Sequence, residues 1–279
     1  MIKSILFSTA AMIAFAAPAF AQDTDEHPFD GIYVGGSVGA AVQPNDGGNS
    51  SILFDRDLNG SFGDTVVTAA GANAFSTGFC GGAASSSANT DCRNDKDAIE
   101  YYGRVGADTH MGPIVIGVMG EFGRPEINDS VSAFSTTPAS YTMTRKLDYT
   151  ASIRGRLGFT PSPMRTTLFY ATGGALYGKV KNSFTTTNTA NSFTQNGDSD
   201  AWGFSGGGGV EQKIGKNFSV GLEYVYNELK DNDARVRVGP GTAPATNPFL
   251  LAGAGGTDFK RSDDKFRWHS MRVTAAFRF

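Results

Sequence analysis

The stretch MRVTAAFRF, residues 271–279, predicts a β-strand with one apolar face, because apolar side chains recur at every second position. Met271, Val273, Ala275, Phe277 and Phe279 fall on one face of an extended chain, and Arg272, Thr274, Ala276 and Arg278 on the other. Successive side chains of a β-strand point to opposite faces. The apolar face would point into the core of a soluble sandwich, or outward into lipid in a membrane barrel.

The other end of the chain indicates export. Residues 1–21 read MIKSILFSTAAMIAFAAPAFA, with Lys3 before an apolar run over 5–17 and the small-residue site AFA ending at Ala21. This is the pattern of a secretory signal peptide, and a run this short predicts no membrane helix, which needs about 20 apolar residues. We therefore expect a signal peptide over 1–21 and a single mature domain over 22–279.

Composition limits the class of partner. The formal net charge is −3, which argues against a nucleic-acid partner. Glycine is abundant, at 36 of 279 residues, which favours strands and turns.

The only two cysteines, Cys80 and Cys92, predict a disulfide in an exported protein, with two free thiols as the alternative.

Turn signals divide the mature chain into eight strand candidates, most of them ten or more residues long. They cover residues 31–42, 98–110, 114–122, 145–160, 167–180, 200–214, 218–230 and 265–279. Strands of this length suit a tilted crossing of a bilayer, which takes about 9–11 residues.

The connections between these strands alternate between long and short. The segments 43–97, 123–144, 181–199 and 231–264 are long, whereas MGP, PSPMRT and GKN make the intervening connections short. Bacterial outer-membrane barrels have short periplasmic turns and long outer loops, and an even strand count returns both termini to the periplasm. A soluble β-sandwich has no reason to sort its loops in this way.

Alternation inside the strands agrees with a lipid-facing exterior. In the fourth strand we expect one outward face of Leu147, Tyr149, Ala151, Ile153, Leu157 and Phe159. The fifth strand, containing LFYATGGALYG, is apolar on both faces and stays ambiguous. Aromatic residues near strand ends are expected to form interfacial girdles: Tyr101, Phe159, Phe169, Trp202, Tyr226, Phe266 and Trp268.

These features predict an all-β fold, an eight-stranded antiparallel transmembrane β-barrel with short periplasmic turns and long extracellular loops, located in the bacterial outer membrane. The alternatives are a secreted antiparallel sandwich and a lipocalin-like barrel, which turns its apolar face inward. In a membrane barrel, by contrast, the charged faces of these strands point inward and form an ion-paired interior.

Several segments resemble a known family. FDGIYVGGSVGAAV after the signal sequence, then RGRLGF, LFYATGGALYG, GGGVEQKI and the final FRF resemble the alphaproteobacterial outer-membrane β-barrel family, porin-like surface proteins related to the OmpA barrel. The resemblance implies that Phe279 is the signal read by the barrel-assembly machinery. It also implies outer-membrane lipid and lipopolysaccharide as surroundings, and we expect a monomer. We expect no peptidoglycan-binding domain after the barrel, in contrast to full-length OmpA.

Alternation places nine charged residues on the inward face: Glu100, Arg104, Glu121, Arg154, Arg156, Glu211, Lys213, Glu223 and Arg272. An eight-stranded barrel has an interior just wide enough for side chains, so these charges must be paired. They predict a packed ionic core that stiffens the barrel or, alternatively, a gate whose pairs exchange partners to open a narrow water path.

The first long loop contains FDRDLNGSFGD, in which Asp55, Asp57, Asn59 and Gly60 match the start of an EF-hand calcium loop. Val66 stands where that motif has a bidentate Glu, and Asp64 lies two residues earlier. The sequence predicts a weak Ca²⁺ site at Asp55, Asp57, Asn59 and Asp64 or, alternatively, an acidic turn. We expect no other cofactor.

Three functions remain open at this point. The first is a porin-like or structural outer-membrane protein that displays long loops. The second is an adhesin or ligand-binding module acting through 43–97 and 231–264, where the apolar run 249–251 either marks a partner contact or packs on the first loop. The third is an outer-leaflet lipid-modifying enzyme, which is disfavoured because His27, His110 and His269 form no recognisable triad.

Overall fold

The computed structural model describes residues 27–43, 50–88, 90–95, 97–162, 165–196 and 198–279. The predicted signal peptide lies outside these residues. The described chain is built from strands and irregular segments. No described segment forms a helix long and apolar enough to cross a membrane.

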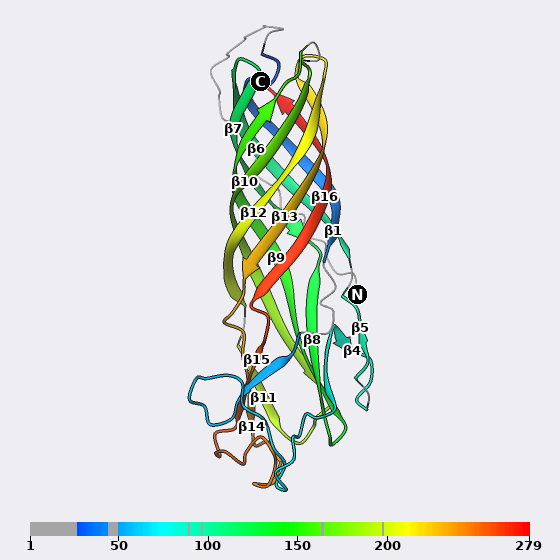
Figure 1. Ribbon diagram of the computed structural model, residues 1–279, viewed down its shortest axis with the longest axis vertical. Helices are drawn as coiled ribbons and strands as arrows, with labels where there is room; N and C mark the ends of the chain where they lie inside the picture. The colour runs from blue at the N-terminus through cyan, green and yellow to red at the C-terminus, as the bar shows by residue number, and fades with distance from the viewer. Residues whose placement is uncertain (1–26, 44–49, 89, 96, 163–164, 197) are drawn as a thin grey trace, which may run out of the picture.

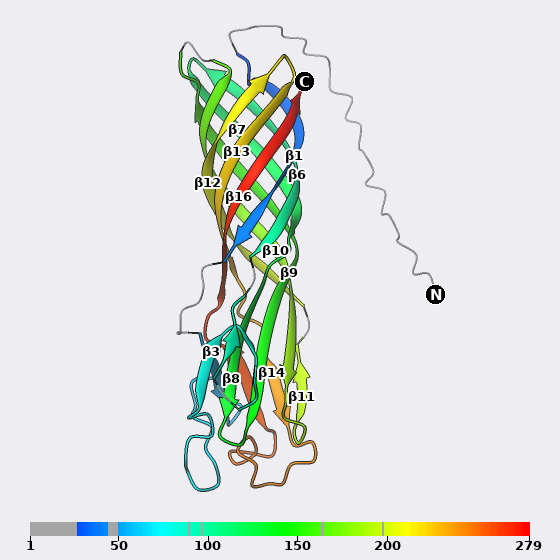
Figure 2. The ribbon, with the colours of Figure 1, turned by 90° about the vertical axis from the view of Figure 1, so that its right-hand side faces the viewer.

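Eight long antiparallel strands close into a barrel, which occupies the upper half of Figures 1 and 2. They are β1 (Gly31–Val42), β6 (Ala98–Met111), β7 (Ile114–Pro125), β9 (Ala139–Phe159), β10 (Thr167–Thr186), β12 (Ser199–Ile214), β13 (Phe218–Lys230) and β16 (Lys265–Arg278). Their order is β10-β12-β13-β16-β1-β6-β7-β9, and pairing of β9 with β10 closes the ring. The fold class and strand count predicted from the sequence are confirmed.

The terminal stretch has the predicted role in this closure. β16 pairs with β13 on one side and with β1 on the other, so the end of the chain joins the beginning of the barrel. Met271, Val273 and Phe277 are 67%, 55% and 46% exposed, whereas Arg272 and Arg278 are buried. The apolar face of this strand therefore points outward.

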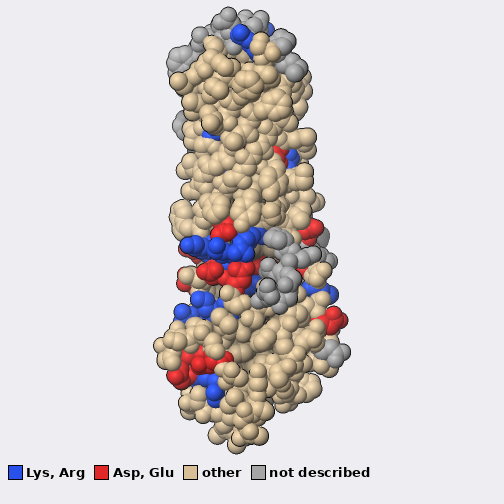
Figure 3. Space-filling view, in the orientation of Figure 1, with Lys and Arg blue, Asp and Glu red and all other residues tan. Residues whose placement is uncertain are grey.

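An apolar band surrounds the barrel. In Figure 3 the surface of the upper half carries few charged side chains, and a belt of Lys, Arg, Asp and Glu lies below it. Exposed apolar side chains on several strands make this band, among them Val34, Val38, Ile99, Val105, Ile116, Val118, Phe122, Ile153, Leu157, Phe169, Trp202, Phe204, Leu222 and Val273. An apolar exterior of this extent needs lipid around it, because water would solvate it poorly.

The long loops contain more structure than the sequence indicated. Their strands are β2 (Ile52–Asp55), β3 (Gly78–Gly81), β4 (Ala83–Ala84), β5 (Cys92–Arg93), β8 (Asn128–Ser135), β11 (Ser192–Gln195), β14 (Val236–Gly239) and β15 (Thr257–Arg261). β3 and β8 extend the sheet next to β9, β11-β14-β15-β2 form a second sheet, and β4 pairs with β5. These elements lie beyond the barrel, at the end opposite the C-terminus (Figures 1 and 2).

Two of the predicted loop boundaries are wrong for the same reason. β9 begins at Ala139, inside the expected loop 123–144, and β10 continues to Thr186, inside the expected loop 181–199. The β9–β10 hairpin continues to pair past the apolar band, through Thr186 and Tyr141. Thr is favoured in strands, so a polar, Thr-rich segment can continue a strand beyond the apolar band, and the boundary expected from polarity falls too early.

The predicted outward face of the fourth strand is wrong at Leu147, which is fully buried. The β9–β10 register shifts between Lys179 and Val180. Lys179 lies opposite Tyr149 and Val180 opposite Leu147, so no residue of β10 lies directly opposite Asp148. This bulge reverses the alternation, so Leu147 points inward while Tyr149 and Ile153 stay outside. The ambiguous strand β10 buries Leu168, Tyr170 and Leu176 and exposes Phe169.

Two members of the predicted aromatic girdle are also misplaced. Phe266 and Trp268 are fully buried inside the barrel, where they share a cluster with Leu147 and Leu229. Strict alternation along β16 requires this, because both have the same parity as the inward Arg272.

Candidate functional site

The barrel interior brings together eight of the nine charged residues predicted to face inward. They are between 0% and 7% exposed: Glu100, Arg104, Glu121, Arg154, Arg156, Glu211, Glu223 and Arg272. Lys213 is the exception, since it is half-buried at the periplasmic end and donates to the carbonyl oxygen of Pro28.

A central ionic layer contains three carboxylates and three guanidiniums, from Glu100, Glu121, Glu223, Arg104, Arg154 and Arg272. Arg104 Nη2 lies 2.8 Å from Glu121 Oε1 and 3.0 Å from Glu223 Oε2. Arg272 Nε lies 2.8 Å from Glu100 Oε1, and its Nη1 lies 3.2 Å from Glu121 Oε2. Arg154 pairs with Glu121 and, at 3.4 Å, with Glu223. Each guanidinium therefore links strands on different sides of the barrel.

A second ionic layer lies nearer the periplasmic end and contains two residues that the sequence prediction omitted. Arg278 Nη2 lies 2.8 Å from Asp108 Oδ2 and 3.0 Å from Glu211 Oε1. Arg156 Nη1 lies 3.1 Å from the same Asp108 oxygen and pairs with Glu211. Asp108 has the parity of Glu100 and Arg104 on β6, and Arg278 that of Arg272 on β16, so alternation could have found both.

Tyrosine rings fill the space between these ions. The guanidinium carbon of Arg272 lies 4.1 Å from the ring centre of Tyr102, and that of Arg156 lies 4.0 Å from the ring centre of Tyr170. Such stacking stabilises a cation that has left water.

The interior charges cancel within each layer. The central layer carries three positive and three negative groups, and the second layer carries two of each. Apolar side chains close both ends, with the cluster around Trp268 towards the outside and the cluster of Phe29, Val115 and Leu168 towards the periplasm. The buried charges of the barrel are thus paired, neutral overall, and enclosed between two apolar clusters.

A further buried ion cluster joins the extracellular structure to the extracellular end of the barrel. Asp129 Oδ2 accepts from Arg145 Nε at 2.7 Å, and Asp129 Oδ1 accepts from Arg261 Nη2 at 2.7 Å. Burial would raise the pKa of Asp129, but the two guanidiniums outweigh it and lower that pKa. The sequence prediction missed this cluster, because residues from three separate segments meet only after the loops fold.

The extracellular structure has its own apolar core. Phe54 and Phe75 from the first long loop pack against Phe249 and Phe259 from the last one, with ring centres 5.0–6.4 Å apart. Tyr141 of β9 lies against the same group. The apolar run 249–251 therefore contributes Phe249 to packing on the first loop, while Leu251 stays 37% exposed.

The predicted calcium residues gather at the edge of this core. Carboxylate oxygens of Asp55, Asp57 and Asp64 lie within 4.8 Å of one another. Asp55 is buried, and its two oxygens accept the backbone N–H groups of Asn59 and Gly60. Val66, at the position of the missing twelfth ligand, is buried in the apolar core. Calcium binding here stays a prediction.

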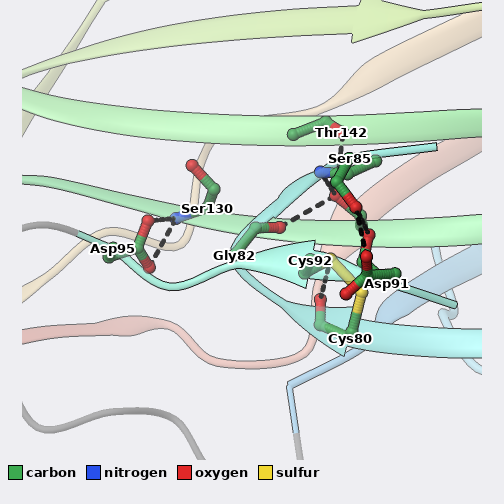
Figure 4. The surroundings of a disulfide bond; sticks show 10 residues. Cys80, Gly82, Ser85, Asp91, Cys92, Asp95, Ser130 and Thr142 are labelled. Atoms are coloured by element: carbon green, nitrogen blue, oxygen red, sulfur yellow. Dashed lines mark hydrogen bonds between the residues drawn. A yellow bond between two sulfur atoms is a disulfide. The ribbon is translucent and has the colours of Figure 1, made fainter.

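The predicted disulfide between Cys80 and Cys92 is present and joins β3 to β5 (Figure 4). Gly82 follows β3 at a φ of 105°, and a Cβ there would lie 2.1 Å from the Arg93 carbonyl oxygen, so only glycine fits. Its N–H donates to Ser130 O at 2.7 Å, and Asp95 accepts from the Ser130 N–H. The disulfide loop is thereby attached to β8.

A closed antiparallel barrel with an apolar exterior band and an ion-paired interior is an integral outer-membrane β-barrel. The chain matches the family model described as the outer membrane protein beta-barrel domain over residues 7–279. The protein belongs to this family, and its location is the bacterial outer membrane.

Curated relatives are outer-membrane proteins too. The chain is 27% identical over 166 residues to the 31 kDa outer-membrane immunogenic protein of Brucella melitensis, covering 60% of each chain. It is 29% identical over 158 residues to the 22 kDa outer membrane protein of Rhizobium leguminosarum bv. viciae, covering 56% of this chain and 65% of that one. The aligned part thus spans less than two thirds of these relatives.

Solved outer-membrane proteins are similar at the level of overall shape. The outer membrane protein OprG from Pseudomonas aeruginosa is 12% identical, with 90% of this chain and 96% of that chain covered and a TM-score of 0.46. Ail of Yersinia pestis is 12% identical, with 90% and 99% covered and a TM-score of 0.33.

Proposed function

We propose that this protein is a sealed, structural outer-membrane barrel that holds a rigid extracellular β-structure above the membrane. The observation that carries the proposal is the interior, where two neutral ionic layers lie between two apolar clusters. Desolvated, mutually paired charges are costly to separate, which favours a packed core over a gate.

The test is single-channel conductance of the refolded mature chain, residues 22–279, in a planar bilayer. A folded barrel, identified by heat-modifiable gel mobility, should give no discrete steps. The Glu121→Ala/Arg272→Ala double variant removes one carboxylate and one guanidinium from the central layer without changing its net charge. That variant should conduct more than the parent, whereas steady steps from the parent would show an open pore and overturn the proposal.

A second candidate function is binding through the first and last long loops. β2 of segment 43–97 pairs with β15 of segment 231–264, so the two loops form one continuous surface. Arg235 and Lys260 lie over the ring of Phe62 on this structure, at 5.1 and 5.8 Å. If these loops bind a ligand, replacing 56–64 with a short Gly-Ser linker should abolish binding to intact target cells while leaving barrel mobility unchanged.

We propose that the barrel has no enzymatic activity. His269 is on the outside and hydrogen-bonds Tyr224 Oη at 2.6 Å, whereas Ser270 is buried and donates to Glu100. Neighbouring residues on opposite faces cannot act as nucleophile and base. Lipid A that is chemically unchanged after expression of the protein supports this, and a modification lost in His269→Ala would contradict it.

We propose lipid, lipopolysaccharide and the barrel-assembly machinery as partners of a monomeric barrel. The side chains of Lys146 and Lys181 are 45% and 52% exposed and offer ammonium groups to lipid phosphates, and both also pair with carboxylates. Phe279 is 61% exposed beside Phe277, and its N–H donates to Ile32 O. Deleting Phe279 should slow assembly in cells more than refolding in detergent.

A further inference from the structure

The segment His27–Asp30 lies against the periplasmic end of the barrel. Phe29 is fully buried, and its carbonyl oxygen accepts from Arg278 Nη1 at 2.7 Å. The Arg278 guanidinium also lies 5.2 Å from the Phe29 ring centre. The residues on either side of Phe29 are therefore held in place although they precede the first strand.

This segment meets the end of β6 at His110. The His110 side chain is 1% exposed, and its Nδ1 lies 2.7 Å from Asp30 Oδ1. The ring centres of His27 and His110 lie 5.0 Å apart, with the ring planes tilted by 40°. Two imidazoles and one carboxylate thus converge from elements that are 80 residues apart in the chain.

Two imidazole nitrogens in this group have no protein partner. Within the part of the chain that the structure describes, His27 Nδ1 and His110 Nε2 are buried without a hydrogen bond. Leaving a buried polar atom unsatisfied costs about 1–3 kcal/mol, and a metal ion held by these two nitrogens would remove that cost. The Nδ1 contact of His110 with Asp30 fixes the ring and leaves Nε2 available, as carboxylates do behind metal-binding histidines.

We propose that His27 and His110 bind a divalent transition metal, with Zn²⁺ as the reference ion, and that Asp30 orients the His110 ring from behind. One nitrogen of each imidazole and one carboxylate oxygen lie within 4.8 Å of one another. Imidazole favours Zn²⁺, Cu²⁺ and Ni²⁺ over Ca²⁺ and Mg²⁺, which prefer oxygen.

The position of the site suggests what the metal does. The Asp30 side chain is 39% exposed, which gives an ion access from the periplasm. A metal held by both histidines would fasten the segment that precedes β1 to the end of β6. The consequence is a firmer closure of the periplasmic end, independent of the ionic layers inside the barrel.

The experiment uses the untagged mature chain, residues 22–279, folded in detergent. Zn²⁺ is titrated by calorimetry and Co²⁺ by its visible absorption, and one ion per chain is expected. His110→Gln and His27→Gln should each weaken binding by at least about tenfold, and Asp30→Asn by roughly 10–100-fold. His269→Gln is the matched control on the outer surface and should bind as the parent does.

The outcomes separate the proposal from its competitors. Full affinity in His110→Gln overturns it, and so does binding that depends on His27 alone, which places the ion on the leading segment. Equal loss in His269→Gln also overturns it, because binding then reflects surface histidines in general. Heat-modifiable mobility checks that each variant is folded, and His27→Gln, which precedes the first strand, tests the site even if His110→Gln does not fold.

Discussion

Arg272 of β16 and Glu100 of β6, 172 residues apart in the chain, meet inside the barrel with Nε 2.8 Å from Oε1. Neither strand pairs with the other, since β1 lies between them. The contact therefore ties second-neighbour strands through the interior. Arg104–Glu223, Arg156–Asp108 and Arg278–Asp108 likewise link strands that share no backbone hydrogen bonds.

Removing one partner of this pair should destabilise the barrel strongly. Arg272→Met leaves Glu100 buried opposite an apolar group, which costs about 3–5 kcal/mol of unfolding free energy. The measurement is urea unfolding in lipid vesicles, followed by gel mobility. The Glu100→Gln/Arg272→Met double variant should lose less than the sum of the two single variants, because they act on one contact. Strict additivity would show that the pair is energetically independent.

Mild acid should strengthen the attachment of the disulfide loop. Burial is the largest effect on Asp95 and raises its pKa from 3.8 to about 6. The folded loop thus binds the proton of the Asp95 carboxyl more tightly than the unfolded chain does. The stabilisation of the folded loop by this proton is therefore full below pH 3.8 and is lost as the pH rises through 6. The protection factor of the Ser130 amide, corrected for intrinsic exchange, should fall between pH 4 and roughly 7. Asp95→Asn should remove this dependence, and a parent profile that is flat in this range would contradict it.

Loss of the disulfide should loosen one loop without opening the barrel. The bond closes a loop with a sequence separation of 12, for which chain entropy gives about 3 kcal/mol. Cys80→Ser/Cys92→Ser should therefore be cut faster by protease between residues 81 and 91. Its heat-modifiable mobility should stay that of the parent, because β3 and β5 lie outside the closed ring. Earlier melting of the whole barrel would contradict this separation.

Calcium binding at Asp55, Asp57 and Asp64 should be weak. Backbone N–H groups already occupy both Asp55 oxygens, and Val66 offers no twelfth ligand, so we expect dissociation constants of about 10⁻⁴–10⁻³ M. Millimolar Ca²⁺ should slow proteolysis within 56–64, and Mg²⁺ serves as the control ion. Asp57→Asn should abolish the protection, and no effect of Ca²⁺ on the parent would leave an acidic turn as the correct interpretation.

Much of the barrel could be predicted from the sequence, because lipid outside and a narrow interior impose alternation on every strand. The strand β13 has the predicted limits, 218–230, and the eight strands and their order of long and short connections are as expected. Leu147 points inward, against the prediction, because Asp148 has no opposite residue on β10 and this bulge reverses the alternation. A hydrophobic pattern does not reveal a bulge. Trp268 lies inside the barrel because it has the parity of Arg272 on β16, whereas its residue type alone favours the membrane interface.

The extracellular structure could not be predicted in the same way. Its core depends on contacts between Phe75 and Phe249, which come from loops at opposite ends of the chain. Its short strands lack the sustained periodicity of the barrel strands, and Arg261 finds Asp129 only through the folded loops. Long-range contacts of this kind have no local sequence signal.

The continuous β9–β10 hairpin has a consequence at the cell surface. β9 has 21 residues, so it is roughly 70 Å long at about 3.3 Å per residue, which exceeds the thickness of the bilayer. The extracellular surface of the protein is thus a folded structure held in one shape by the continuous β9–β10 hairpin. An antibody or a phage that meets it encounters a surface assembled from several segments, so short peptides copied from single loops should be poor substitutes for the folded epitope.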